Sequence, residues 1–399
     1  MTVAGLRHPK RAGALLMSAG LHFLGFSPFA VLPAAAGLEG VGTFTVVLAL
    51  IGVTAAGGLI SVFVGSALDR YGAIAVASIG LGFLALGYAG LVFLPATPAV
   101  WLCAGAVLGI GVQATGGQTA FYVLRTGRPD AAAQGHFISN LGISAAGIVL
   151  PWLVAVGGML AGLRGAIASI AAMCAVVLVL AWRVARRQRS RPAEAQQPKP
   201  IASAKAFSVM SRVTVVAVGF GVLASSSLLF STALAASAKG NVTVAAAFVA
   251  CVSAGAAIGR LAFAIALSPT STTHVVNRVA LICFGLQVAG CFVVAFGPAT
   301  LFFGCVGAVV YGLGSSGSLA LLPVALHRQT QGLPQGVVLG QARLVMTPFQ
   351  VATIAAVGGI AANSTTKETF LGLAVCIATA ALAVGIAEVI RYRASYSPE

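Results

Sequence analysis

The chain has 399 residues, of which 59% are hydrophobic and only 8% are charged, and its mean hydropathy is +1.02. Because a soluble domain carries about 25% charged residues, this composition excludes an ordinary water-covered globular protein. The net charge of +16 would suggest a nucleic-acid partner in a soluble chain. Here the basic residues stand between long apolar runs, which is typical of membrane proteins and argues against a nucleic-acid site.

Twelve apolar stretches are each long enough to cross a bilayer as a helix, for which about 20 residues suffice. They lie at residues 12–36, 42–65, 74–95, 98–124, 134–158, 163–183, 209–236, 242–267, 276–297, 299–325, 336–361 and 368–390. The stretch between the sixth and the seventh is rich in Arg, Lys, Gln and Pro, which indicates a solvated linker. We therefore expect an all-α membrane protein with a six-helix half at 1–183, a cytoplasmic linker at 184–208 and a second six-helix half at 209–393.

The basic residues are distributed unevenly between the two ends of these predicted helices. The termini, the linker and the even-numbered loops carry nearly all of them, and we count Arg260 with this group. The opposite end carries only Arg164, Lys239 and Lys367. Because basic loops stay on the cytoplasmic side, we expect a multi-pass protein of the inner (plasma) membrane with both termini in the cytoplasm.

The two predicted halves share features at one constant offset. Gln134-Gly135 and Gln335-Gly336 open the fifth and the eleventh stretch, and Gly157-Gly158 and Gly358-Gly359 close them. Two related halves joined by a linker are the pattern of transporters that are built from parallel repeats. The repeat therefore supports the division into halves.

One charged motif, GSALDRYG at 65–72, interrupts the apolar first half. It resembles the loop signature of the major facilitator superfamily, a pattern of the type G-x-L-a-D-r-x-G-r-k, at both glycines, the leucine, the aspartate and the arginine. It departs from that pattern after Gly72, where Ala73 and Ile74 replace a basic pair. With the twelve stretches and the repeat, the resemblance covers nearly the whole chain.

This resemblance implies the major facilitator fold, in which two six-helix halves rock around a central site in alternating access. It also implies a gating role for the motif, whose expected gating residues are Gly65, Asp69, Arg70 and Gly72. Asp69 is then expected to pack against the start of the eleventh helix. A carboxylate there meets free N–H groups and the positive end of the helix dipole, so the contact would hold the two halves together on the cytoplasmic side.

The resemblance further implies that the first, fourth, seventh and tenth helices surround a central cavity, so polar residues at mid-depth of the spans are candidates for substrate binding. The candidates are His22, Gln113, Gln118, Asn140, Ser227, Tyr311, Ser315 and Arg343. Asn140 and Arg343 belong to the fifth and the eleventh stretch instead. A serine in a membrane helix can also bond a carbonyl of its own helix or join neighbouring helices, and this alternative stays open for each serine.

Arg343 is the basic residue that we place deepest within a span, and it shares one face of the eleventh helix with Thr347 and Gln350. An arginine inside a membrane span indicates a functional site. It lies about 12 Å from the predicted cytoplasmic end at 1.5 Å per residue. Its side chain therefore either binds an anionic ligand or reaches cytoplasmic water, and the sequence leaves both open.

No Asp or Glu stands in the middle of a predicted span, although proton-driven carriers usually protonate a buried carboxylate. His22 is the only histidine at mid-depth, and its ordinary pKa of about 6.5 suits proton transfer. His22 or Asp69 would therefore serve a proton-coupled carrier. The sequence shows neither metal-ligand spacing nor a nucleophile–base pair, so we expect no cofactor, no metal site and no enzymatic activity.

These features predict a secondary active transporter that moves a small organic solute by alternating access, with export as the first prediction. The runs at 108–119 and 252–263 resemble bacterial arabinose-efflux-like permeases. The alternative is uptake of a small organic anion, with Arg343 as its counter-charge. The expected partners are a small-molecule substrate, the lipid bilayer and protons as the candidate coupling ion, without nucleic acid, and we expect a monomer.

Overall fold

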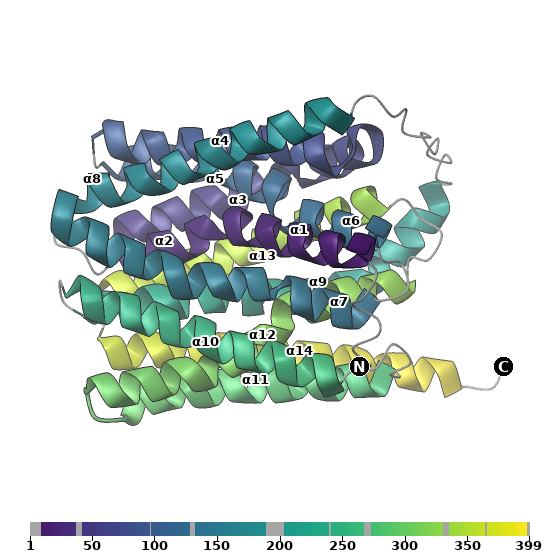
Figure 1. The fold of residues 1–399 in the computed structure, drawn as a ribbon. Coiled ribbons are helices and arrows are strands. Elements are labelled where there is room, and N and C mark those ends of the chain that lie inside the picture. The colour runs from purple at the N-terminus through teal and green to yellow at the C-terminus, as the bar shows by residue number, and fades with distance from the viewer. Residues whose placement is uncertain are drawn as a thin grey trace.

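The computed structural model describes residues 9–36, 42–95, 97–127, 132–188, 203–238, 241–266, 273–329, 335–363 and 365–396. All regular secondary structure in these ranges is helical (Figure 1). In chain order the helices are α1 (Pro9–Gly25), α2 (Ser27–Ala35), α3 (Thr43–Tyr71), α4 (Ala73–Phe93), α5 (Pro98–Thr115), α6 (Gly117–Gly127), α7 (Ala132–Ser139), α8 (Leu141–Gln188), α9 (Ser203–Ala236), α10 (Val242–Ala266), α11 (Thr273–Phe296), α12 (Leu301–Gln329), α13 (Gln335–Asn363) and α14 (Thr366–Tyr396).

Nine helices in the described part of the chain are long and apolar enough to cross a membrane, when helices that continue across a short break are counted as one. Three shorter apolar segments lie at Arg164–Val177, Gly221–Ala236 and Leu301–Gly317. Together these segments follow the order of the predicted stretches. The multi-pass helical architecture therefore agrees with the sequence, whereas the count of twelve spans stays a prediction because three segments are short.

Three spans in the first part of the chain break at mid-length. α1 gives way to α2 at Phe26, α5 to α6 at Gly116, and α7 to α8 at Asn140. Two of the breaks lie against each other, since a Cβ built on Gly25 would lie only 2.3 Å from the Cα of Gly116. Only glycine permits so close a backbone crossing, so the first and fourth spans are fixed to one another at their breaks.

Helix α8 contains the turn between the predicted fifth and sixth stretches. Gly162 has φ 69° there, a left-handed conformation that glycine adopts without steric cost. A Cβ on Gly157 would lie 2.9 Å from the Cα of Ala166, a separation that a continuous helix of ten residues does not allow. The chain therefore folds back on itself at Gly162 and forms two antiparallel helices.

The helices run side by side, and α1 begins at the same end of the bundle at which α14 ends, on the right in Figure 1. We call this end the terminal end. Helices α1–α8 fill mainly the upper half of that view and α9–α14 the lower half. The predicted linker lies largely outside the described residues, because α8 continues to Gln188 and α9 begins at Ser203. The domain boundaries at 183 and 209 therefore stay a prediction.

The most extensive contacts between these two groups of helices are those of α3 with α13 and of α8 with α10. In the first pair the Ser61 hydroxyl donates to the carbonyl of Gly340 at 2.7 Å. A Cβ on Gly58 would lie 1.7 Å from Oγ1 of Thr347, so a larger residue at that position would force the helices apart. Small residues let membrane helices approach closely, and the main cluster of buried apolar side chains spans both groups.

Candidate functional site

A cavity lies between the two groups of helices, with walls from α2, α3, α8, α9, α10, α12 and α13. It encloses about 850 Å³ of space between protein atoms, its opening to solvent included. Its polar lining consists of hydroxyl, amide and guanidinium groups. These belong to Thr54, Ser144, Ser227, Ser231, Ser253, Arg260, Ser315, Arg343 and Gln350.

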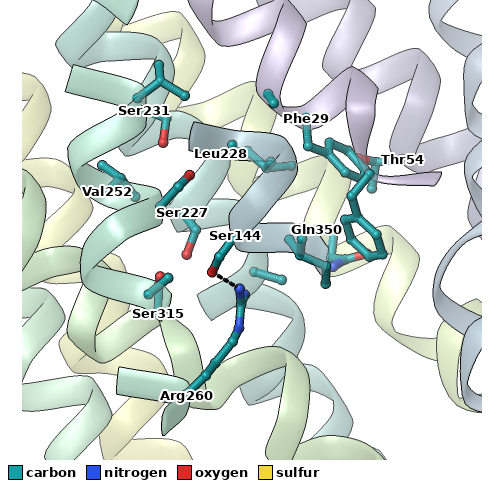
Figure 2. A pocket seen from close by; sticks show the side chains of 18 of the residues that line it. Phe29, Thr54, Ser144, Ser227, Leu228, Ser231, Val252, Arg260, Ser315 and Gln350 are labelled. Carbon is teal, nitrogen blue, oxygen red and sulfur yellow. Dashed lines mark hydrogen bonds between the residues drawn. The ribbon is translucent and has the colours of Figure 1, made fainter. Parts of the chain in front are cut away.

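Arg260 is the most informative residue of this lining, and Figure 2 shows it reaching from α10 into the cavity. Its side chain is only 3% exposed. One guanidinium nitrogen donates to the hydroxyl of Ser144 on α8, and Nε has no hydrogen-bond partner among the described residues. Our assignment of Arg260 to the loop residues that orient the chain was therefore wrong: this charge is inside the protein.

Helix α13 brings a second arginine to the lining of the cavity. Arg343 and Gln350 both line the cavity. Thr347, which was predicted to share their face, instead packs against Gly58 of α3 and donates its hydroxyl to the carbonyl of Arg343 at 2.8 Å. Arg343 is thus placed beside a possible ligand, although its role as a ligand-binding residue stays a prediction.

Two of the serines that line the cavity, Ser227 and Ser315, bond carbonyls of their own helices. Ser227 donates to the carbonyl of Leu223 at 3.2 Å, and Ser315 donates to that of Gly312 at 3.0 Å. Of the predicted substrate-binding residues, Ser227, Ser315 and Arg343 line the cavity.

A different wall is aromatic. Phe26, at the break between α1 and α2, and Phe29, on α2, both line the cavity with partly exposed rings. Their ring centroids lie 5.5 Å apart with an interplanar angle of 48°. Figure 2 shows Phe29 and Thr54 on the side of the cavity away from Arg260.

His22 lies behind this aromatic wall and is not among the residues that line the described cavity. It is fully buried, its Nδ1 lies 2.8 Å from the Ser139 hydroxyl, and its ring packs edge-on against Phe121. Its ring centroid is 5.8 Å from that of Phe26. His22 thus joins α1 to α6 and α7, one layer outside the cavity.

Four other predicted substrate-binding residues are buried outside the described lining. They are Gln113, Gln118, Asn140 and Tyr311. The side-chain amides of Gln118 and Asn140 have no hydrogen-bond partner among the described residues. Tyr311 stacks on Phe230 with ring centroids 3.8 Å apart, so it contributes to packing within the second group of helices.

The predicted gating motif is almost entirely helical. Residues Gly65 to Tyr71 form the end of α3, and the chain turns at Gly72, which has φ 79°. Arg70 is exposed and its guanidinium lies 5.2 Å from the ring centroid of Tyr71. The motif therefore ends a helix at the terminal end of the bundle and does not form an extended loop.

The position of Asp69 follows from the antiparallel packing of α3 on α13. Ser61 bonds Gly340, and Gly58 lies against Thr347 farther from the terminal end. Continuing this register two turns beyond Ser61 brings Asp69 near the beginning of α13 at Gln335. The geometry is compatible with the predicted carboxylate–helix contact, which stays a prediction.

The residues that the sequence reasoning missed are Arg260, its partner Ser144, and the phenylalanines Phe26 and Phe29. A signal for Arg260 was present, because residue 260 falls inside the predicted stretch 242–267. A charge several residues inside an apolar stretch indicates a functional residue. The sequence carries no comparable signal for the phenylalanines, because apolar rings are common on lipid-facing surfaces as well.

Comparisons with known proteins give a match in structure only. No family model matches the sequence, and no curated protein does. The crystal structure of a point mutant of the nucleoside transporter NupG is similar with a TM-score of 0.66 and 14% identity, over 94% of this chain and 99% of that chain. A second crystal structure of NupG gives a TM-score of 0.62 and 13% identity, over 93% of this chain and 98% of that chain.

At this level of identity the likeness shows the fold alone. It confirms the predicted fold class, an all-α membrane protein with the fold of this transporter. It does not test the resemblance to arabinose-efflux-like permeases or the predicted site residues, so both stay predictions.

Proposed function

We propose that the protein is a secondary transporter that carries a small organic anion through the cavity between its two groups of helices. The observation that carries this proposal is the buried Arg260, set in a cavity whose described lining contains no carboxylate. The fold that the chain shares with a nucleoside transporter supports transport as the activity. The two groups of helices would rock around the cavity in alternating access.

Arg260 has no carboxylate beside it in the described lining. Burial of an ion costs several kcal/mol, and one hydroxyl from Ser144 offsets only part of that cost. The chain has seven Asp and Glu residues, and none of them stands between residues 195 and 367. Helices α9–α13 therefore have no carboxylate to pair with Arg260 or Arg343. An anionic substrate would supply the charge that these helices lack.

Export is the direction that this chemistry favours. A membrane potential that is negative inside drives an anion outward with about 2.3 kcal/mol per charge and 100 mV. Export of an anion thus needs no coupled proton. This agrees with the absence of an Asp or Glu from the middle of the predicted spans, where a proton-driven carrier usually has one. Orientation in the inner membrane with cytoplasmic termini belongs to the same proposal and is supported by the distribution of the basic residues.

Uptake of the anion is the second candidate. An anion that moves inward against the membrane potential needs a coupling ion such as a proton. His22 is fully buried and hydrogen-bonded to Ser139, and it contacts Phe26 of the cavity wall. A proton on His22 could therefore affect the substrate through that wall. The two candidates differ in whether a pH gradient drives accumulation.

The test is transport by the purified full-length protein in proteoliposomes. Each substrate in the panel is a carboxylate paired with its neutral amide, and an imposed potassium diffusion potential sets the membrane potential. We expect carboxylates to be transported in preference to their amides and to move toward the positive side. Equal transport of carboxylates and amides would contradict the proposal.

A further inference from the structure

The cavity has two chemically different ends, and the directions of the helices order them along the bundle. α10 runs toward the terminal end, so Arg260 lies nearer that end than Val249 does (Figure 1). α13 runs in the opposite direction, so Arg343 lies nearer the terminal end than Gln350 does. Both arginines therefore stand at the terminal end of the cavity.

The other end carries the phenylalanines and further apolar side chains, beside the polar Thr54 and Gln350. α2 begins at mid-bundle and runs away from the terminal end, and it brings Phe29 and Ala30 to the lining. Leu228 and Val249 line the cavity at the same end. Phe29 is partly exposed although its neighbours Pro28 and Ala30 are buried, which means that its ring meets the open space of the cavity.

The chemistry of the two ends together limits the substrates that fit the cavity. A small inorganic anion bound to Arg260 would leave the phenylalanines without a contact. A neutral ring against the phenylalanines would leave Arg260 buried without a counter-charge. Only a molecule that carries both an acidic group and a ring would pair with Arg260 and also contact the phenylalanines.

We infer that the substrate is an aromatic anion, whose planar ring packs against Phe26 and Phe29 while its acidic group binds Arg260 and the Ser144 hydroxyl. This inference rests on the proposed anion transport and adds the ring to it. The tilted arrangement of the two phenylalanine rings leaves their faces and edges available for the offset or edge-to-face contacts that aromatic rings prefer. Ser227 and Ser315, which line the cavity between the two ends, would bond substituents of the ring.

The experiment compares the binding of four probes to the full-length protein in detergent, by calorimetry. Benzoate carries ring and charge, cyclohexanecarboxylate carries the charge on a saturated ring, acetate carries the charge alone, and benzamide carries the ring alone. We expect benzoate to bind best and cyclohexanecarboxylate second. An aromatic contact contributes about a fivefold difference in affinity between these two, because such pairs add about 1 kcal/mol beyond the area that they bury.

The matched variants are Phe29→Leu in the cavity and Phe63→Leu as control, since Phe63 is 73% exposed on the outside of α3. Phe29→Leu should remove the preference for benzoate over cyclohexanecarboxylate and leave acetate binding unchanged, and Phe63→Leu should change neither. Equal affinities of the wild type for benzoate and cyclohexanecarboxylate would overturn the aromatic inference alone. Equal affinities for benzoate and benzamide would overturn the anion proposal instead, so the two failures are distinguishable.

Discussion

The two groups of helices differ in the polar residues that mark them. In α1–α8 some buried hydroxyls bond the backbone near the helix breaks: the Thr119 hydroxyl donates to the carbonyl of Ala114, beside the break at Gly116, and Ser18 donates to the carbonyl of Ala120. In α9–α14 the helices that line the cavity run unbroken, and they carry Arg260 and Arg343. A broken membrane helix needs side chains that satisfy its freed backbone groups, whereas an unbroken helix can present a charge to a ligand.

This contrast predicts that the charge of the substrate is recognised by α9–α14. Helices α1–α8 supply the aromatic wall and the broken helices whose backbone groups are hydrogen-bonded by side chains. Four variants test it, in order of decreasing expected effect. Two of them address the arginines of the second group, one addresses the contact between the groups, and one addresses the hydrogen-bonded histidine of the first.

Replacement of Arg260 should have the largest effect. Arg260→Met keeps a long side chain and removes the charge, so transport of carboxylates should fall about 100-fold or more, as expected when one partner of a buried charged pair is removed. The same variant should melt at an equal or higher temperature than the wild type without substrate, because an unpaired buried charge is unfavourable. Transport assays and thermal unfolding in detergent measure both effects.

Arg278→Met is the matched control, because Arg278 is an exposed arginine on α11. It should leave transport and melting temperature near those of the wild type. If Arg260→Met melted much lower and still transported carboxylates, Arg260 would be a structural residue and the division of roles would be wrong.

Asp69→Asn should have the next largest effect, through the contact between the two groups. The amide keeps the size of the side chain but loses the negative charge that the start of α13 would stabilise, a contribution of up to about 2 kcal/mol. Transport should therefore slow about tenfold while substrate affinity in detergent stays unchanged. Ser66→Ala, on an exposed part of the same helix, is the control, and near-normal transport by well-expressed Asp69→Asn would exclude the gating role.

Arg343→Lys should produce a smaller and more selective effect. Lysine keeps the charge but loses the bidentate geometry of the guanidinium, so the apparent KM for carboxylates should rise about fivefold, the equivalent of about 1 kcal/mol. Neutral amides, where they are transported, should be unaffected. Equal changes for carboxylates and amides would instead indicate that Arg343 extends toward water and does not bind the substrate.

The sequence predicted the fold well because long apolar stretches and the one-sided distribution of basic residues are set by the bilayer itself. The site was harder to predict. Arg343 lines the cavity, and its role as a ligand-binding residue stays a prediction, whereas Arg260 was assigned to the loop residues although it falls inside a predicted stretch. Helical periodicity identifies which residues share a face, and it does not show whether that face meets lipid, another helix or a cavity.

The same limit explains the polar residues of the first group. Gln113, Gln118 and Asn140 are buried at or near helix breaks, outside the described cavity lining, so their predicted role in substrate binding stays a prediction. The breaks at Phe26, Gly116 and Asn140 depend on contacts between spans that are far apart in the sequence, as the crossing of Gly25 and Gly116 shows. Pattern reading along one stretch does not detect such contacts.

The smallest effect on substrate exchange is expected for His22→Gln, which also decides between export and uptake. Glutamine retains a hydrogen bond to Ser139 but does not titrate near neutral pH, whereas histidine does. Counterflow exchange should stay within about twofold of the wild type, because His22 lies one layer behind Phe26 and does not line the described cavity.

If the carrier takes up its anion with a proton on His22, this variant should lose accumulation driven by a pH gradient, since the proton and the substrate would no longer be coupled. Ser139→Ala is the control, because it removes the hydrogen bond to Nδ1 and keeps the titratable ring. Gradient-driven accumulation that survives in His22→Gln would remove His22 from the mechanism, and a wild type that ignores the pH gradient and follows the membrane potential would support export of the anion.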